Sequence, residues 1–146
     1  MKTYKGKYIP KNPNKYKGDH TNIIYRSSWE LKFMKYCDAR KSIIEWSSEE
    51  IIIPYRSPLD GRIHRYFVDF YIKSIDMNNN ITNYLVEVKP KNKINPPIKN
   101  SQNSKKYLYE VYEYLKNQAK WNAAKEYCKD KKMEFIIITE DNLGIK

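Results

Sequence analysis

The sequence predicts one α/β domain in which helices flank a mixed central sheet. Its 146 residues are about the length of a single domain. Segments with helical spacing of apolar residues alternate with short runs of β-branched and aromatic residues. The last run follows a long helical stretch, and a strand reached through a helical crossover adds parallel to an earlier strand. We therefore expect a single domain over residues 1–146.

The first helix is expected to begin within the stretch RSSWELKFMKYCDAR. Ser27 and Glu30 have the S-x-x-E spacing of a capping box, with the serine as the N-cap. Trp29, Phe33 and Cys37 follow at helical spacing and predict a face that packs into the core.

Three strands are expected after this helix. Residues 51–55 form a short apolar run before a turn that contains proline and glycine. Residues 62–75 are rich in β-branched and aromatic types, and the following DMNNN is typical of a hairpin loop. Residues 83–91 then supply the second strand of that hairpin, so the last two strands should pair antiparallel.

A long helical stretch is predicted over roughly residues 105–131. One helix and two helices are both compatible with the sequence, because residues 117–122 are weaker helix-forming material. Residues 133–139, MEFIIIT, end the order as a buried strand. The predicted order is helix, three strands, helix, strand.

The charge of the chain points to a polyanionic partner. The net charge is +11, and six lysines precede the first acid, Asp19. We interpret residues 1–22 as a basic N-terminal arm and residues 91–104 as a basic loop. Such charge suits the phosphate backbone of a nucleic acid, and a merely soluble basic surface is the simpler alternative.

Several other classes of protein do not fit the sequence. Hydrophobic residues make up 40%, which argues against disorder, and no apolar run is long enough to span a membrane. The first residues lack the apolar core of a secretory signal. Cys37 and Cys128 are far apart and lack metal-ligand spacing, so we expect reduced thiols in a cytoplasmic protein.

Two acids lie within the most strand-like segments. Asp69 is embedded in RYFVDFYI and Glu87 in YLVEVKP, with Lys89 two residues further on the same face of its strand. Paired carboxylates bind hard cations such as Mg²⁺ or Mn²⁺, and a neighbouring lysine can orient water or offset phosphate charge. An ion pair on an exposed sheet face is the alternative for Glu87 and Lys89 alone.

These motifs resemble a known group of nucleases. FVDFYI followed by YLVEVKP, after a helix that carries Glu30, resembles the PD-(D/E)xK nuclease superfamily. Longer stretches, among them KGKYIPKNPNKYKGD and SEEIIIPYRSPLDGRIHRYFVDFYI, resemble the head-completion nucleases of T-even-like tailed phages. The DNA-nicking subunit of a heteromeric bacterial transposase is a more distant likeness. The resemblance implies a restriction-endonuclease-like core in the order α-β-β-β-α-β.

The resemblance also implies roles for individual residues. Asp69 and Glu87 match the metal-binding acids, and Lys89 matches the catalytic lysine. Glu30 matches a helix glutamate that contacts the metal, although it would also complete the capping box. The superfamily's proline before the aspartate is Val68 here, which changes no metal ligand. The implied cofactor is Mg²⁺, with Mn²⁺ as the alternative ion.

Six further basic side chains are candidates for contact with DNA: Arg26, Arg65, Lys91, Lys93, Lys99 and Lys120. Trp121, next to the last of these, is better explained by core packing than by base stacking, and His64 by a structural or phosphate contact.

The function expected from the sequence is that of a metal-dependent DNA endonuclease. It would hydrolyse phosphodiester bonds in double-stranded DNA during phage head completion and DNA packaging. Capsid or portal proteins are further expected partners. We expect the protein in the host cytoplasm during assembly, with association with the virion as the alternative. A non-enzymatic head-completion protein that retains a nuclease fold is the leading alternative function, and a sequence-specific restriction nuclease is the third.

Overall fold

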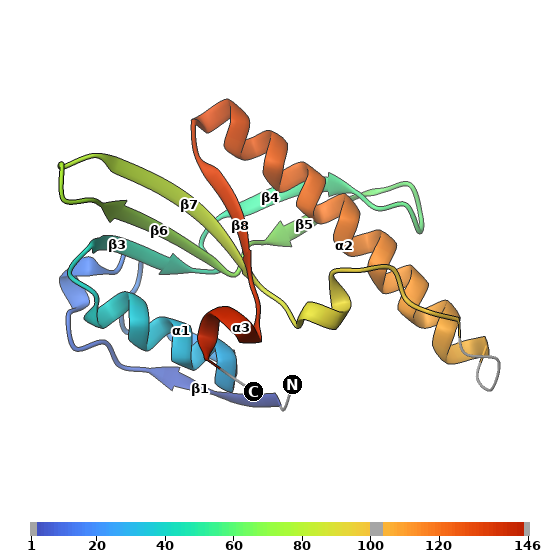
Figure 1. Ribbon diagram of the computed structural model, residues 1–146, viewed down its shortest axis with the longest axis horizontal. Coiled ribbons are helices and arrows are strands. Elements are labelled where there is room, and N and C mark those ends of the chain that lie inside the picture. Colours follow the sequence, from blue (N-terminus) through green and yellow to red (C-terminus); the bar gives the residue numbers. More distant parts are fainter. Residues whose placement is uncertain (1–2, 100–103, 145–146) are drawn as a thin grey trace.

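A four-stranded mixed sheet in the order β3-β6-β7-β8 forms the centre of the molecule (Figure 1). The computed structural model describes residues 3–99 and 104–144. The elements in chain order are β1 (Thr3–Tyr8), η1 (Pro13–Lys15), β2 (Ile23–Ser27), α1 (Ser28–Ala39), β3 (Ile43–Ser48), β4 (Ile52–Arg56), β5 (Ile63–Phe67), β6 (Phe70–Ile75), β7 (Ile81–Val88), η2 (Lys91–Lys93), α2 (Ser104–Lys131), β8 (Glu134–Ile138) and α3 (Glu140–Leu143).

The pairing of the last strands follows the sequence-based prediction. β6 and β7 are antiparallel, with Phe70 opposite Val86, and β8 joins β7 in parallel after the α2 crossover, with Ile138 opposite Val88. The fold is therefore the mixed α/β arrangement expected from the sequence.

Helices cover both faces of the central sheet (Figure 1). Phe33 and Met34 of α1 belong to a buried cluster with Phe70 and Val86 of the sheet. Trp121 and other residues of α2 belong to a second cluster, which includes the opposite sheet face and the β4–β5 hairpin. In β7, even-numbered residues therefore face α1 and odd-numbered residues face α2.

The first strand of the central sheet differs from the prediction. That strand is β3, which had no counterpart in the predicted order, whereas the predicted strand over residues 51–55 falls mostly in β4. β4 pairs with β5 in a separate two-stranded sheet. The predicted single strand over residues 62–75 is likewise divided into β5 and β6.

A β-bulge explains the division. Ser48 pairs with Phe70 in the central sheet, and Ile52 pairs with Phe67 in the hairpin, so residues 49–51 lie opposite only residues 68–69. Because of the extra residue, the two chain segments pair in the central sheet on one side of the bulge and in the β4–β5 hairpin on the other. Glu49, within the bulge, has a φ of 56°, a left-handed conformation that is uncommon for a residue other than glycine.

The N-terminal segment is folded against α1, whereas the sequence predicted a basic arm over residues 1–22. β1 pairs with β2, and the buried carboxylate of Asp38 at the end of α1 holds the segment that follows β1. Asp38 accepts hydrogen bonds from the Tyr8 hydroxyl at 2.6 Å and from the backbone N–H groups of Lys11 at 2.7 Å and Asn12 at 3.0 Å.

Lys15 has a structural role at the same place. Its Nζ donates hydrogen bonds to the carbonyl oxygens of Cys37 at 2.7 Å, Asp38 at 2.9 Å and Arg40 at 2.8 Å. The last carbonyls of a helix lack partners within the helix, and a lysine at this end satisfies them. The Lys15 ammonium group is therefore used in hydrogen bonds that stabilise the fold.

The long helical stretch forms one continuous helix, α2, of 28 residues. Its N-terminal half extends beyond the central sheet beside the loop that follows β7 (Figure 1). Among the described residues, no helix has the length and apolar character needed to cross a membrane.

Candidate active site

Asp69 directly precedes β6 and faces Glu87 of the neighbouring strand β7. Phe70 and Val86 are the last pair of the β6–β7 ladder at this end, and Asp69 and Glu87 are the next positions along it. Directly opposite residues of an antiparallel pair point to the same face, here the face toward α2. The bulge therefore places Asp69 beside Glu87 at the end of the sheet.

Hydrogen bonds hold both carboxylates. Asp69 Oδ2 accepts from the backbone N–H of Val88 at 2.8 Å. Glu87, which is 6% exposed, accepts at Oε2 from the Tyr66 hydroxyl at 2.9 Å and from Trp121 Nε1 at 3.4 Å. Sequence reasoning missed Tyr66 as a partner of Glu87, because only its place on the hairpin face toward α2 brings it there.

The two carboxyl groups perturb each other. Burial and the neighbouring charge of Glu87 raise the pKa of Asp69 well above its usual value, and the two carboxyls share a hydrogen bond. Burial and the charges of Glu87 and Asp69 also raise the pKa of Tyr66, so its hydroxyl remains a donor to Glu87.

Glu30 approaches this pair from the helix on the other face of the sheet. Burial raises the pKa of Glu30, and the charges of Glu49 and Glu87 raise it further, while the backbone N–H of Arg26 lowers it. The three acids predicted for the site thus influence one another electrostatically. Their shared environment arises from the position of the α1 N-terminus near the end of the strands.

The cap of α1 only partly matches the predicted capping box. Ser27 Oγ accepts from the Glu30 N–H at 3.1 Å, as predicted for the N-cap. Glu30 Oε1 instead accepts from the N–H of Arg26, also at 3.1 Å, one residue before the N-cap. Arg26 in turn pairs with Glu49, with 3.0 Å between Nε and Oε1.

The donor set suits a hard divalent cation. Asp69 and Glu87 offer carboxylate oxygens, and their mutual repulsion, seen in the raised pKa of Asp69, is what a bound cation would relieve. Within the described residues, no three His, Cys, Asp or Glu side chains lie together as a complete ligand set. Mg²⁺ is commonly held by one or two carboxylates, with water and substrate phosphate as the other ligands. The residues present fit that pattern.

Comparison with known proteins identifies the family. Residues 40–140 match the family described as TnsA-like endonuclease N terminal. The chain belongs to this family. The "Head completion nuclease" of Enterobacteria phage T4 is 37% identical to it over 144 residues, which cover 96% of this chain and 93% of that protein. No solved structure matches the chain.

The family match covers most of the site of this TnsA-like endonuclease. Asp69, Glu87 and Lys89 lie inside the matched residues 40–140, whereas Glu30 lies before them. The relative spans the region of Glu30 as well, since it covers nearly the whole chain. Membership in an endonuclease family agrees with the restriction-endonuclease-like fold and with an enzyme that cleaves DNA.

Two lysines lie close to the acid pair of the endonuclease. Lys89 follows β7, and its backbone N–H donates to the Ile138 carbonyl at 2.9 Å. Lys120 of α2 lies over the rings of Tyr66, at 5.5 Å, and Tyr55, at 5.9 Å. Burial lowers the pKa of Lys120, and the nearby ammonium groups of Lys116 and Lys89 lower it further. This region therefore combines carboxylates that can hold a cation with lysines whose positive charge can attract a phosphate.

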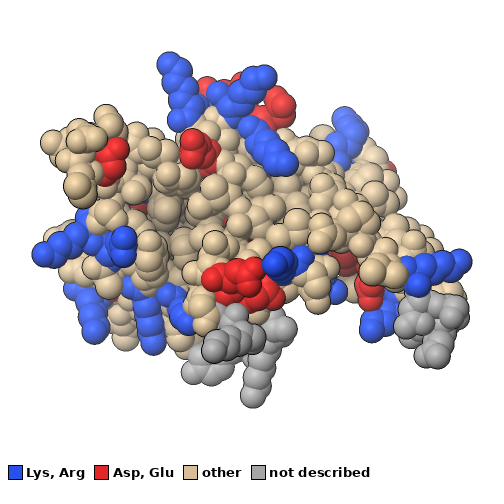
Figure 2. Space-filling model, in the orientation of Figure 1, with Lys and Arg blue, Asp and Glu red and all other residues tan. Residues whose placement is uncertain are grey.

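The other predicted DNA contacts are dispersed. Figure 2 shows lysine and arginine side chains spread over this face of the molecule instead of gathered in one patch. Lys93 and Lys99 are exposed in the loop after β7, and residues 100–103 of that predicted loop lie outside the described residues. Arg65 is exposed on the β4–β5 hairpin and lies over the Phe67 ring at 5.5 Å.

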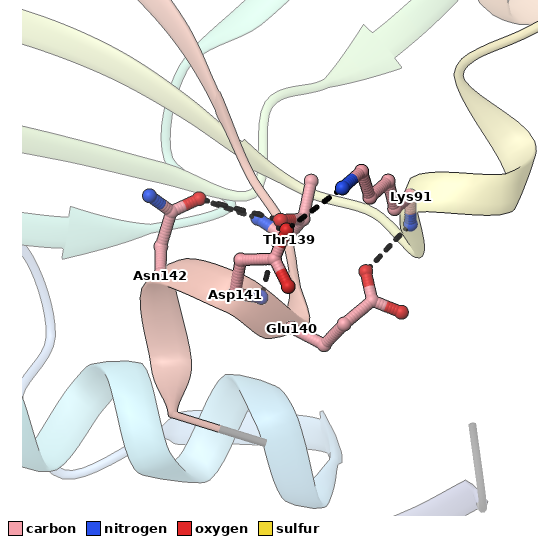
Figure 3. Close-up of polar contacts among 5 residues, drawn as sticks. All are labelled: Lys91, Thr139, Glu140, Asp141 and Asn142. Atoms are coloured by element: carbon pink, nitrogen blue, oxygen red, sulfur yellow. Dashed lines mark hydrogen bonds and ion pairs between the residues drawn. The ribbon is translucent and has the colours of Figure 1, made fainter. Parts of the chain in front are cut away.

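Lys91 is tied to α3 (Figure 3). Its backbone N–H donates to Glu140 Oε1 at 2.8 Å, and its Nζ pairs with Asp141 Oδ2 at 3.1 Å. Arg26 is similarly paired with Glu49. Part of the charge of these two residues is therefore balanced within the protein.

Proposed function

We propose that this TnsA-like endonuclease is a metal-dependent enzyme that hydrolyses phosphodiester bonds in double-stranded DNA during phage head completion and DNA packaging. The observation that carries the proposal is the facing pair Asp69–Glu87 beside Lys89, on a chain 37% identical to a head completion nuclease. A largely buried pair of repelling carboxylates destabilises a fold, so its presence favours a functional site.

The residues around the pair supply the other requirements of hydrolysis. When bound at Asp69 and Glu87, a Mg²⁺ or Mn²⁺ ion supplies water activation and stabilisation of the charge that develops on the scissile phosphate. Val88, Tyr66 and Trp121 hold the two carboxylates in place through their hydrogen bonds. Preorganised groups of this kind need no rearrangement during the reaction.

The lysines complete the site. Lys89 would orient the attacking water and offset negative charge on the phosphate. Lys120 adds a second positive charge on the side of α2, and its partly buried position strengthens its attraction for phosphate. Glu30 would act from α1 on the metal or its water, provided that it releases the Arg26 N–H.

The proposed setting of the reaction is the assembling phage head. The head-completion context comes from the name of the T4 relative, and we propose DNA packaging as the step served and capsid or portal proteins as partners. We propose that the protein acts in the host cytoplasm during assembly, with retention in the virion as the alternative.

The test is incubation of the purified protein with supercoiled plasmid in Mg²⁺, in Mn²⁺ and in EDTA. We expect nicked or linear DNA with a divalent ion and none with EDTA. The Asp69→Asn variant serves as the control for a contaminating nuclease. A folded, DNA-binding wild-type protein that cuts in none of these conditions would support the non-enzymatic head-completion protein instead.

A further inference from the structure

An open groove lies along the N-terminal half of α2. Its volume is about 860 Å³ between the loop that follows β7 and the helix, and its wall includes Lys89, two residues after Glu87. Figure 1 shows that loop lying alongside α2. The groove therefore opens onto the place where the scissile phosphate is proposed to bind.

The walls of the groove carry aromatic and amide side chains. α2 contributes the rings of Tyr109 and Tyr114, and the loop contributes the amides of Asn92 and Asn95. Aromatic rings stack on the faces of unpaired bases whatever their sequence, and amides can bond to base edges. Lys93, also in the wall, offers charge to a backbone phosphate.

Asn117 marks the floor of the groove as a binding surface. It is 9% exposed and lines the cavity, and among the described residues its side-chain amide makes no hydrogen bond. In that part of the chain the buried side-chain polar atom without a partner is Trp46 Nε1, so the Asn117 amide is accessible from the groove, where it can bond to a base edge. Trp121, one helical turn further along α2, bonds to Glu87, so Asn117 lies between the groove and the acid pair.

The acids in the groove do not exclude a nucleic acid strand. Glu110 and Glu113 are part of the wall, and Glu113 is paired with Lys116 at 3.0 Å. Two lysines of the wall, Lys89 and Lys93, outnumber Glu110, the wall acid for which no ion pair is found among the described residues. A volume of this size holds a ligand of the small-molecule class, or a few nucleotides, and is too small for a duplex.

We propose that this groove binds an unpaired stretch of a DNA strand of a few nucleotides, next to the scissile phosphate. The preferred substrate is then duplex DNA that carries a single-stranded overhang, with cleavage near the junction. This inference rests on the proposed nuclease function for its link to cleavage, whereas the binding of an unpaired strand can be measured without cleavage.

The test uses fluorescein-labelled DNA and the full chain with Asp69→Asn, so that no DNA is cut during titration. Fluorescence anisotropy compares a blunt duplex with the same duplex carrying a thymidine overhang. Stacking on one ring is worth roughly a factor of ten in affinity or more. We expect at least about tenfold tighter binding of the overhang DNA, in EDTA as well as with Ca²⁺.

Variants of the wall assign the effect to the groove. Tyr109→Ala with Tyr114→Ala should remove the preference for the overhang and leave the affinity for blunt duplex unchanged. Tyr112→Ala is the matched control, because Tyr112 is 50% exposed on the same helix and does not line the cavity. The single variant Tyr109→Ala, at a side chain 65% exposed, provides a second measurement if the double variant does not fold.

The possible outcomes separate this inference from the nuclease function. Equal affinity for blunt and overhang DNA would overturn the inference, as would a Tyr109→Ala variant that keeps the full preference. A preference for the overhang in a protein whose wild type never cuts plasmid would support the groove and refute the nuclease. In the wild type, cuts mapped to the junction would support both.

Discussion

Asp69 and Glu87 face each other one position beyond the Phe70–Val86 pair of β6 and β7. Asp69 reaches this position because residues 68–69 lie opposite a three-residue segment, 49–51, where the chain leaves the central sheet. A bulge that ends pairing and re-aims a side chain is common beside active sites. The bent junction of two sheets thus creates the acid pair.

Asp69→Asn should separate catalysis from DNA binding. The substitution is nearly isosteric and removes one negative oxygen from the proposed ion site. Loss of one electrostatic stabiliser costs about 10²–10³ in rate, so plasmid cleavage should fall at least that far. DNA affinity should hold or rise, because an anion near the phosphate is removed. Cleavage rates and a mobility-shift titration measure the two effects.

Thermal melting must accompany these measurements to show that the variant is folded. A folded Asp69→Asn protein that cuts at the wild-type rate would remove Asp69 from the site and, with it, most of the support for an enzyme. Asp76→Asn is a matched control, because this exposed acid lies in the β6–β7 turn, where it accepts hydrogen bonds from Asn78 and Asn80 and faces no other carboxylate. It should cut at close to the wild-type rate.

The same pair predicts a pH-dependent stability without divalent ions. Burial and Glu87 raise the pKa of Asp69, so the folded chain holds its proton to higher pH than the unfolded chain does. Stability should therefore fall as pH rises from the ordinary aspartate value of about 3.9 toward the raised value. In EDTA near neutral pH, Asp69→Asn should melt at a higher temperature than the wild type.

Addition of Mg²⁺ provides the second part of this measurement. An ion that binds only the folded state raises the melting temperature. Mg²⁺ should stabilise the wild type and have a much smaller effect on Asp69→Asn. Equal stabilisation of both proteins, or a variant that is less stable than the wild type in EDTA, would contradict a strained carboxylate pair.

Asp38→Asn should loosen the N-terminal segment. Burial alone would raise the pKa of Asp38, but hydrogen bonds from Tyr8, Lys11 and Asn12 outweigh it and lower the pKa. Hydrogen bonds to a charged group contribute about 1.5–3 kcal/mol each, so the free energy of unfolding should fall by roughly 2–3 kcal/mol. Urea denaturation measures the loss.

The pH profile checks the same carboxylate. Because its folded pKa is lowered, the stability from Asp38 is present above the ordinary aspartate pKa and is lost as pH falls through the lowered value. The Asn variant should lack this step. Asp19→Asn, an exposed acid bonded to nearby Thr21, is the control and should leave the free energy of unfolding almost unchanged.

The sequence predicted the acid pair because its signal is local. An acid within a run of apolar strand residues is rare without a reason, and both Asp69 and Glu87 lie in such runs. The parallel addition of β8 could also be predicted, because a long helix separates it from β7. These parts of the fold depend on patterns within one segment or on simple rules of connection.

The parts that differ from the prediction depend on contacts between distant segments. Residues 62–75 form one continuous β-type pattern, and only the change of partner strand at residues 68–69 divides it. The lysine-rich start predicted an extended basic arm, but the buried carboxylate of Asp38 holds this segment, and it lies 26 to 30 residues away along the chain from the groups that it binds. The secondary-structure propensity of one segment does not show which distant residues it will contact in the fold.

The basic residues in the loop after β7 are expected to act on DNA backbone without reading sequence. Lys93 and Lys99 are exposed there, whereas the Lys91 ammonium is paired with Asp141. Lys93→Gln with Lys99→Gln should reduce the slope of log affinity against log salt concentration by about 0.9 for each phosphate that is no longer neutralised. Affinity should fall by a similar factor for different DNA sequences, measured by titration at several salt concentrations.

Lys15→Gln is the control because it removes one lysine charge by the same type of substitution, from a lysine with a structural role. Its Nζ bonds the last carbonyls of α1, so the variant should melt at a lower temperature and keep the wild-type salt slope. The loop variant should show the reverse, a reduced slope with little change in melting. If the slope of the loop variant stayed at the wild-type value, Lys93 and Lys99 would not contact phosphate, and a protein surface of the phage head would be the better partner for them.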